Sequence, residues 1–93
     1  VDAPPSTSLN SVSLDRRRYW RGPLWPVMLW LYEWALRRRG LTTYADRMQS
    51  AGVQLVADGR FAEYYEPVTG EALGSADQSW TAAVALDWLS RER

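Results

Sequence analysis

The sequence predicts an all-α chain with three helices. A long apolar stretch over residues 23–39 ends in arginines and a glycine. A single apolar stripe at 3.6-residue spacing follows over residues 43–58, and Trp80, Val84 and Trp88 then repeat at positions i, i+4 and i+8. Each of these patterns is typical of a helix. At 93 residues, the chain forms one domain at most.

Residues 1–15 are rich in Pro, Ser and Asn, and we predict a linker or surface loop there. The start of the chain is polar and lacks the apolar segment of a signal peptide. The longest apolar run, residues 24–35, is shorter than the roughly 20 residues that span a bilayer. We therefore expect a cytoplasmic protein with no membrane contact.

The first helix is predicted over Pro23–Arg39. A proline is acceptable in the first turn, where the N–H groups have no intrahelical partner. Three arginines at the other end complement the helix dipole, and Gly40 provides a stop. The stretch is apolar on all sides, so we expect it to be buried on all sides, which requires more protein than this chain offers. Glu33 is the exception, and we expect it to pair with Arg37 or Arg39 or to face a polar cavity.

The second helix is predicted over Thr43–Asp58, with Thr42 as its N-cap and Gly59 as its stop. Gly52 should weaken it slightly. The predicted buried stripe consists of Tyr44, Met48, Ala51, Leu55 and Val56.

The third helix is predicted over Ser79–Arg91, capped by Asp77 or Ser79, with Ala83 joining the buried stripe. Before it, the sequence RFAEYYEPVTGEALGS predicts an irregular loop whose FAEYY run could be extended.

The composition excludes several classes of chemistry. The chain has no Cys and no His, which rules out disulfides, Cys-based zinc sites, thiol catalysis and a His-containing triad within it. A metal would need carboxylates alone, and no Asp-rich loop favours one. Eleven basic residues, all Arg, balance eleven acidic ones, which argues against a general nucleic-acid or membrane-surface binder.

Three segments combine residues that could carry chemistry. The first is RRRYWRGPLWP, residues 16–26. Its arginines and aromatic rings would suit single-stranded nucleic acid, or a sugar stacked on the rings, with Gly22 letting the backbone approach a ligand. The alternative is that Trp20 and Trp25 only anchor the start of a buried helix.

The second segment, FAEYYEPVTGE, contains Glu63 between aromatic residues. Desolvation there would raise its pKa and suit a general acid or base. The alternative is a solvated loop glutamate, which fits Glu66 and Glu71 better. In the third segment, QSWT, Gln78 and Trp80 either form a helix cap with a packed indole or place an amide and a stacking face in a pocket.

Taken together, YWRGPLWP, FAEYYEPVTGEALGS and QSWTAAVALDWL resemble the C-terminal end of glycoside hydrolase family 63. The resemblance covers residues 16–91 and is greatest to the bacterial glucosylglycerate and mannosylglycerate hydrolases. It implies that residues 16–93 are the C-terminal, three-helix part of an (α/α)6 barrel, in which two concentric rings of helices surround an active site.

The resemblance also implies an inverting hydrolysis of an α-glycosidic bond by two carboxyl groups. The general base falls on Glu63, and the sugar-binding positions fall on Tyr19, Trp20, Trp25, Gln78 and Trp80, with Gly22 beside them. Many relatives have Phe where this chain has Gln78. The general acid would be an Asp of the barrel's first half, so we expect the 93-residue chain alone to be inactive. No metal or cofactor is implied.

Two alternatives remain open at this point. One is a family 63 α-glucosidase that acts on oligosaccharides. The other is a non-catalytic helical module that docks to a partner through its Trp-rich face.

Overall fold

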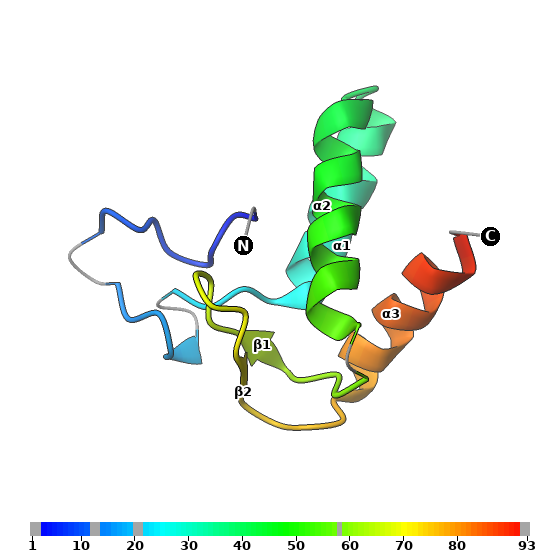
Figure 1. Ribbon diagram of the computed structural model, residues 1–93. Coiled ribbons are helices and arrows are strands. Elements are labelled where there is room, and N and C mark those ends of the chain that lie inside the picture. The colour runs from blue at the N-terminus through cyan, green and yellow to red at the C-terminus, as the bar shows by residue number, and fades with distance from the viewer. Residues whose placement is uncertain (1–2, 12–13, 20–21, 58, 92–93) are drawn as a thin grey trace.

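The computed structural model describes residues 3–11, 14–19, 22–57 and 59–91. Over these residues the chain forms α1 (Pro26–Arg38), α2 (Thr42–Val56), β1 (Tyr64–Tyr65), β2 (Ala72–Leu73) and α3 (Ser79–Arg91) (Figure 1). The predicted helical fold class is confirmed. The FAEYY run, for which extended backbone was one reading, contributes strand β1, which pairs antiparallel with β2. In the described residues, no helix has the length and apolar character needed to cross a membrane.

Helix α1 begins at Pro26, later than the predicted Pro23. The cause is a long-range contact, because Leu24 is held in extended backbone by two hydrogen bonds to Tyr65. Trp25, at the N-cap position, is also extended, with φ −112° and ψ 115°. Pro26 then takes the first helical position, where its missing N–H costs nothing.

The turn between α1 and α2 is a Schellman motif. The N–H groups of Gly40 and Leu41 donate to the carbonyls of Arg37 and Leu36, each over 3.0 Å. Gly40 has φ +74°, the left-handed conformation that glycine adopts at little cost, and the predicted stop is confirmed. The predicted N-cap Thr42 is wrong, because the N-cap position is Leu41 and no side chain caps this end.

The buried face of α2 is rotated from the predicted stripe. Tyr44 is 55% exposed, and the small Ala45 is buried in its place. Gly52 is a packing requirement, since an added Cβ would lie 2.2 Å from Cη2 of Trp88. The buried residues of α2 are Ala45, Ala51, Gly52, Leu55 and Val56.

Helix α3 has the predicted bounds, and Val84 and Trp88 lie in its buried face as expected. Trp80 and Ala83, by contrast, are exposed. The core forms where the three helices meet the stretch around Ala62 and Tyr65; its buried members are Leu24, Leu29, Ala51, Leu55, Ala62, Tyr65, Val84 and Trp88.

Glu33 is a buried charge that joins two helices, and its predicted pairing with Arg37 is confirmed. Its carboxylate accepts hydrogen bonds from Arg37 Nε (2.6 Å), from Trp88 Nε1 (2.8 Å) and from both Nη atoms of Arg91 (2.8 and 2.9 Å). Burial alone would raise the pKa of Glu33, but the hydrogen bonds from Arg91, Arg37 and Trp88 outweigh it and lower the pKa to about 2. We call these four residues the Glu33 cluster.

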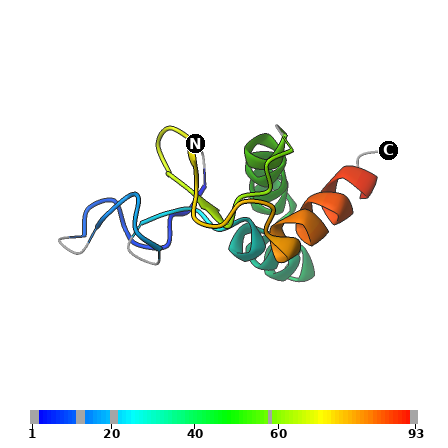
Figure 2. The same cartoon turned by 90° about the horizontal axis from the view of Figure 1, so that it is seen from below.

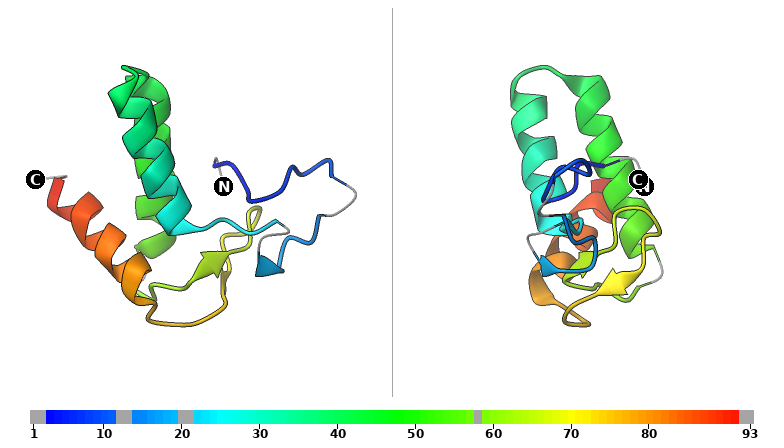
Figure 3. Two further views of the ribbon diagram at one scale, coloured as in Figure 1. Left: turned by 180° about the vertical axis from the view of Figure 1, so that it is seen from behind. Right: turned by 90° about the vertical axis from the view of Figure 1, so that its left-hand side faces the viewer.

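The molecule is thin, with extents of 38 × 29 × 18 Å. The N-terminal segment and the β-ribbon lie on one side of it and the helices on the other (Figure 2). Helices α1 and α2 run side by side, and α3 diverges from them (Figure 3). Three large apolar side chains of α1 are more than a third exposed. Within this chain α1 is therefore not buried all round, and Leu31, Tyr32 and Trp34 are exposed.

Candidate functional site

The first two motif segments are joined side by side by a short backbone ladder. The N–H of Leu24 donates to the carbonyl of Tyr65 over 2.7 Å, and the N–H of Tyr65 donates back over 2.8 Å. The phenol oxygen of Tyr65 also accepts from the N–H of Ala62 over 3.0 Å, inside the core. These bonds fix the FAEYY run against the segment that leads into α1.

The third motif segment meets the same run from the other side. The N–H of Gln78 donates to the carbonyl of Phe61 over 2.8 Å, and the hydroxyl of Thr81 donates to the carbonyl of Ala62 over 2.9 Å. The side-chain oxygen of Gln78 accepts from the N–H of Trp80 at 3.3 Å, so Gln78 caps α3 in place of the predicted Asp77 or Ser79. Trp80 itself is 45% exposed, which leaves its indole accessible.

Glu63 lies within the run Phe61–Tyr65, whose other residues contact the first and third motif segments. Its N–H donates to the carbonyl of Ser75 over 2.9 Å, and its Oε1 accepts from the N–H of Ser75 at 3.4 Å. The side chain is half-buried. Gly74 is essential to this arrangement, because an added Cβ would lie 2.9 Å from Oε1 of Glu63 and 2.5 Å from Cε1 of Tyr64. A carboxylate that is partly shielded and held by one backbone N–H retains acceptor capacity for a water molecule.

Three aromatic rings cluster beside Glu63. Tyr19 meets Trp25 edge to face at 4.8 Å and Tyr64 at 5.7 Å, and Trp25 lies tilted against Tyr64 at 5.0 Å. The indole N–H of Trp25 donates to the carbonyl of Tyr19 over 3.1 Å. Tyr19 is half-exposed, whereas Trp25 is 2% exposed. In this structure Tyr19 is therefore partly accessible to solvent, and the buried Trp25 packs against it.

Two further predicted site residues are Trp20 and Gly22. Trp20 lies outside the described residues. Gly22 is buried, and an added Cβ would lie 2.6 Å from the carbonyl oxygen of Asp15 and 2.9 Å from Cα of Arg16. The close backbone approach that Gly22 permits in this structure is to its own chain. Its contact with a ligand stays a prediction.

The expectation that Glu66 is a solvated loop residue is wrong. Glu66 is 2% exposed and accepts hydrogen bonds from the N–H groups of Val68 (3.0 Å) and Thr69 (2.9 Å). Its Oε1 lies 3.3 Å from Nε of Arg16. The sequence could have suggested this only through the EPVTG turn, in which a carboxylate can bond to backbone N–H groups two and three residues further on.

The described arginines of the basic run are paired within the chain. Beside the Arg16–Glu66 pair, Nη2 of Arg17 lies 2.7 Å from Glu71, and Nε of Arg18 lies 3.6 Å from Asp15. Charges neutralised in this way offer little attraction for a phosphate backbone, so the arrangement does not favour the nucleic-acid interpretation.

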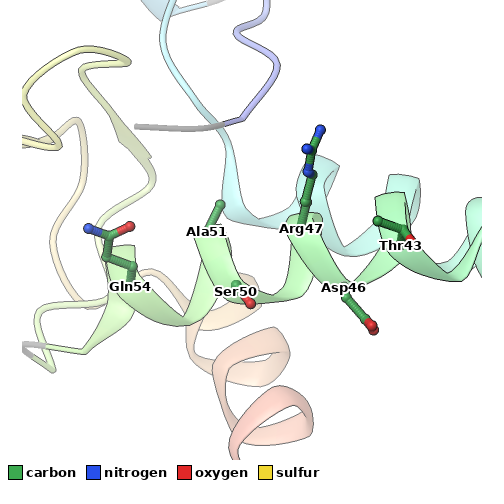
Figure 4. A pocket seen from close by; sticks show the side chains of 6 residues that line it. All are labelled: Thr43, Asp46, Arg47, Ser50, Ala51 and Gln54. Atoms are coloured by element: carbon green, nitrogen blue, oxygen red, sulfur yellow. The ribbon is translucent and has the colours of Figure 1, made fainter.

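Two hollows differ in their relation to this site. One of about 350 Å³ lies close in sequence to Glu63 and is lined by residues that precede β1 and by residues in and after β2: Arg60, Ala62, Ala72, Leu73, Gly74, Ala76 and Asp77. Another of about 390 Å³ runs along α2, where Asp46, Arg47 and Gln54 are among the lining side chains (Figure 4). None of the residues that line the second belongs to a motif segment. Within the described part of the chain, no three acidic side chains gather where they could hold a metal ion.

Comparison with known proteins assigns the chain to a family. Residues 2–81 match the family model described as mannosylglycerate hydrolase MGH1-like glycoside hydrolase domain. The chain belongs to this glycoside hydrolase family. The match includes all three motif segments as far as Thr81, and it also includes most of residues 1–15.

Members of the family give closer comparisons. The chain is 55% identical over 85 residues to the glucosylglycerate hydrolase of Mycolicibacterium hassiacum. The aligned region covers 91% of this chain and 19% of that protein. The crystal structure of the family 63 mannosylglycerate hydrolase from Thermus thermophilus in complex with glucose matches with a TM-score of 0.89 at 36% identity, over 94% of this chain and 22% of that one. The complex with Tris and D-glycerate matches with a TM-score of 0.88 at 36% identity, over 92% and 21%. The chain thus spans about a fifth of the length of these relatives.

Proposed function

We propose that this chain is the C-terminal part of a glycoside hydrolase that cleaves the α-glycosidic bond of glucosylglycerate or mannosylglycerate with inversion. The observation that carries the proposal is that the first and third motif segments both contact the short run Phe61–Tyr65, which contains Glu63. The relative with 55% identity is a glucosylglycerate hydrolase, and the relative with a TM-score of 0.89 is a mannosylglycerate hydrolase.

In this proposal Glu63 is the general base. It takes a proton from a water molecule, whose oxygen attacks the anomeric carbon from the face opposite the glycerate. The bond between that carbon and the glycerate oxygen breaks, and a general acid protonates the departing oxygen. The products are glycerate and a sugar of inverted anomeric configuration. The N–H of Ser75, 3.4 Å from Oε1, helps to orient the carboxylate toward that water.

The aromatic residues bind the sugar. The half-exposed Tyr19 and the exposed Trp80 offer ring faces to the apolar side of a pyranose, with Trp20 completing the wall and the buried Trp25 forming its base. Gln78 caps α3 through its side-chain oxygen, which leaves its NH₂ group as a donor for a sugar hydroxyl. The backbone at Gly22 lies beside the sugar.

The general acid, an Asp, comes from the remainder of an (α/α)6 barrel, as a further part of the same protein or as another chain. The exposed apolar residues of α1 favour such a partner, because an uncovered face of this kind is normally buried in an interface. Residues 16–93 would form the closing part of the barrel and residues 1–15 a segment on its surface. A cytoplasmic location remains a prediction.

The decisive experiment replaces the base in the complete enzyme. Glu63→Gln keeps the size and polarity of the side chain but removes the base, so we expect kcat on glucosylglycerate to fall by about 10²–10⁴-fold. Glu71→Gln is the matched control, since Glu71 lies in the same loop, is exposed, and should leave kcat within about threefold.

Two further readouts separate the alternatives. Proton NMR of the first-formed product reports the anomeric configuration, and retention would contradict the inverting mechanism. A preference for kojibiose-like disaccharides over glucosylglycerate would favour the oligosaccharide α-glucosidase. Near-normal turnover of the Glu63→Gln enzyme would instead support the non-catalytic helical module.

A further inference from the structure

Glu66 is a buried carboxylate that the proposed mechanism does not use. Its side chain is only 3% exposed, yet it carries a charge. Burial would raise its pKa, but the N–H of Val68, the side chain and N–H of Thr69 and the charge of Arg16 together lower it. The turn thus accommodates the anion, and Arg16 is its cationic partner.

Arg16 comes from a loop distant in sequence and is fixed on two sides. Its guanidinium faces Glu66, with Nε 3.3 Å from Oε1. Its backbone lies against Gly22, where even a Cβ would approach Cα of Arg16 to 2.9 Å. The N–H groups of Arg17 and Arg18 both donate to Asp15, over 3.1 Å, which closes the loop on itself. These contacts tie Arg16 to Glu66, to Gly22 and to the turn formed by residues 15–18.

Tyr19 ends that loop in a strained conformation. Its φ of 37° is unusual for a residue with a side chain and persists only where the surroundings impose it. Its ring contacts Trp25 and Tyr64, and its carbonyl accepts from the indole of Trp25 and from the hydroxyl of Ser6. We infer that the position of the ring beside Tyr64 of β1 depends on these contacts and on the anchoring of residues 15–18, which precede it.

We propose that Glu66 is a positioning residue that acts through Arg16 to hold Tyr19 in place as a wall of the sugar subsite. This inference rests on the proposed function. Glu66 does not touch the reacting atoms, so its loss should weaken the binding of substrate and leave the chemical step largely intact.

The experiment is a double-mutant cycle in the complete enzyme, with glucosylglycerate as substrate. Arg16→Met keeps the aliphatic part of the side chain but removes the guanidinium. Glu66→Gln removes the negative charge that the guanidinium of Arg16 faces. Each should raise KM about tenfold and leave kcat within about threefold. Because both act through one contact, the double variant should show no larger KM than the worse single variant. Arg17→Met is the matched control; it removes an exposed pair and should leave KM within about twofold.

A purely structural role for Glu66 predicts another pattern. Loss of the turn bonds alone would lower thermal stability and would add to the effect of Arg16→Met. Unchanged KM in both single variants, or additive effects, would overturn the inference. Arg16→Met tests the same contact without disturbing the buried turn, should Glu66→Gln fail to fold.

Hydrogen exchange keeps the two proposals separate. Amides in residues 14–24 should exchange faster in both single variants, whatever the substrate. If the wild-type enzyme hydrolyses none of the glycosides, the proposed function fails, and the loop anchoring is judged on exchange alone. Unchanged exchange in Arg16→Met would then refute it.

Discussion

The Glu33 cluster gives the most quantitative prediction. A tenfold change in an acid constant corresponds to about 1.4 kcal/mol, so lowering the pKa of Glu33 from 4.5 to about 2 corresponds to about 3 kcal/mol in favour of the folded, charged form. Removing one partner of a buried ion pair typically costs about 3–5 kcal/mol, which agrees. Glu33→Gln keeps the shape of the side chain and leaves Arg37 and Arg91 without their shared counter-charge.

Hydrogen exchange of α3 in the complete enzyme measures this effect locally. Helix α3 is held to α1 by Trp88 and Arg91 through Glu33, so opening of α3 breaks those bonds. A loss of about 3 kcal/mol raises the opening equilibrium about 100-fold, and the exchange of α3 amides should accelerate by the same factor. The control is Asp46→Asn, because this partner of Arg37 is 63% exposed and should change exchange less than about fivefold.

The pH dependence of exchange tests whether ionised Glu33 stabilises the fold. Since the pKa of Glu33 is lower in the folded state, its contribution is fully present above about pH 4.5 and is lost as the pH falls toward about 2. The protection of α3, corrected for intrinsic exchange rates, should decline over that range in the wild-type protein and decline less in Glu33→Gln. Exchange that accelerates less than about tenfold in the variant, or the same acid profile in both proteins, would refute this account of the cluster.

Three substitutions test the packing around the site. Gly52→Ala gains about 1 kcal/mol of helix propensity but forces a methyl group into the indole of Trp88, so we expect a net loss of about 1–3 kcal/mol in urea unfolding; a higher midpoint would contradict this. Gly74→Ala pushes against the carboxylate of Glu63, and we expect kcat to fall about 100-fold in a steady-state assay; an unchanged kcat would show that Glu63 is not held there. Thr81→Val keeps the volume but leaves a buried carbonyl without its donor, which should lower the free energy of unfolding by about 1–3 kcal/mol; equal stability would mean that another donor replaces the hydroxyl.

Local signals predicted the helices well. The bounds of α3 and the stop at Gly40 were right, because periodicity, terminal arginines and a left-handed glycine are properties of neighbouring residues. The start of α1 was placed too early, because its first predicted turn is held in extended backbone by Tyr65. Tyr44 was assigned to the core because it fits the apolar stripe. In the structure the small residues Ala45 and Gly52 lie in the buried face of α2, and Tyr44 is exposed.

The sequence named candidate residues for the site, but it did not show how they would be connected. Glu63 stood out in the sequence as a carboxylate among aromatic residues, but nothing local shows that it would lie against Gly74 and Ser75. The partner of the buried Glu66 is Arg16, a residue from a distant loop. Pairings of this kind arise only when the chain has folded, so sequence patterns identify candidates and the tertiary structure decides between them.

Backbone strain lies in the first two motif segments and immediately before the third. Tyr19, Phe61 and Asp77 have φ values of 37°, 48° and 53°, and each conformation costs about 1–3 kcal/mol in a residue with a side chain. Two of these residues are tied together, because Gln78 donates to the carbonyl of Phe61 and Asp77 donates to that of Arg60. A loop free to relax would not keep such geometry. The hydrogen bonds and buried side chains around these residues hold it, and the ordered helices behind them offset its cost. Positive φ values at non-glycine residues therefore lie in and next to the motif segments, and strain held in this way is a common feature of preorganised sites.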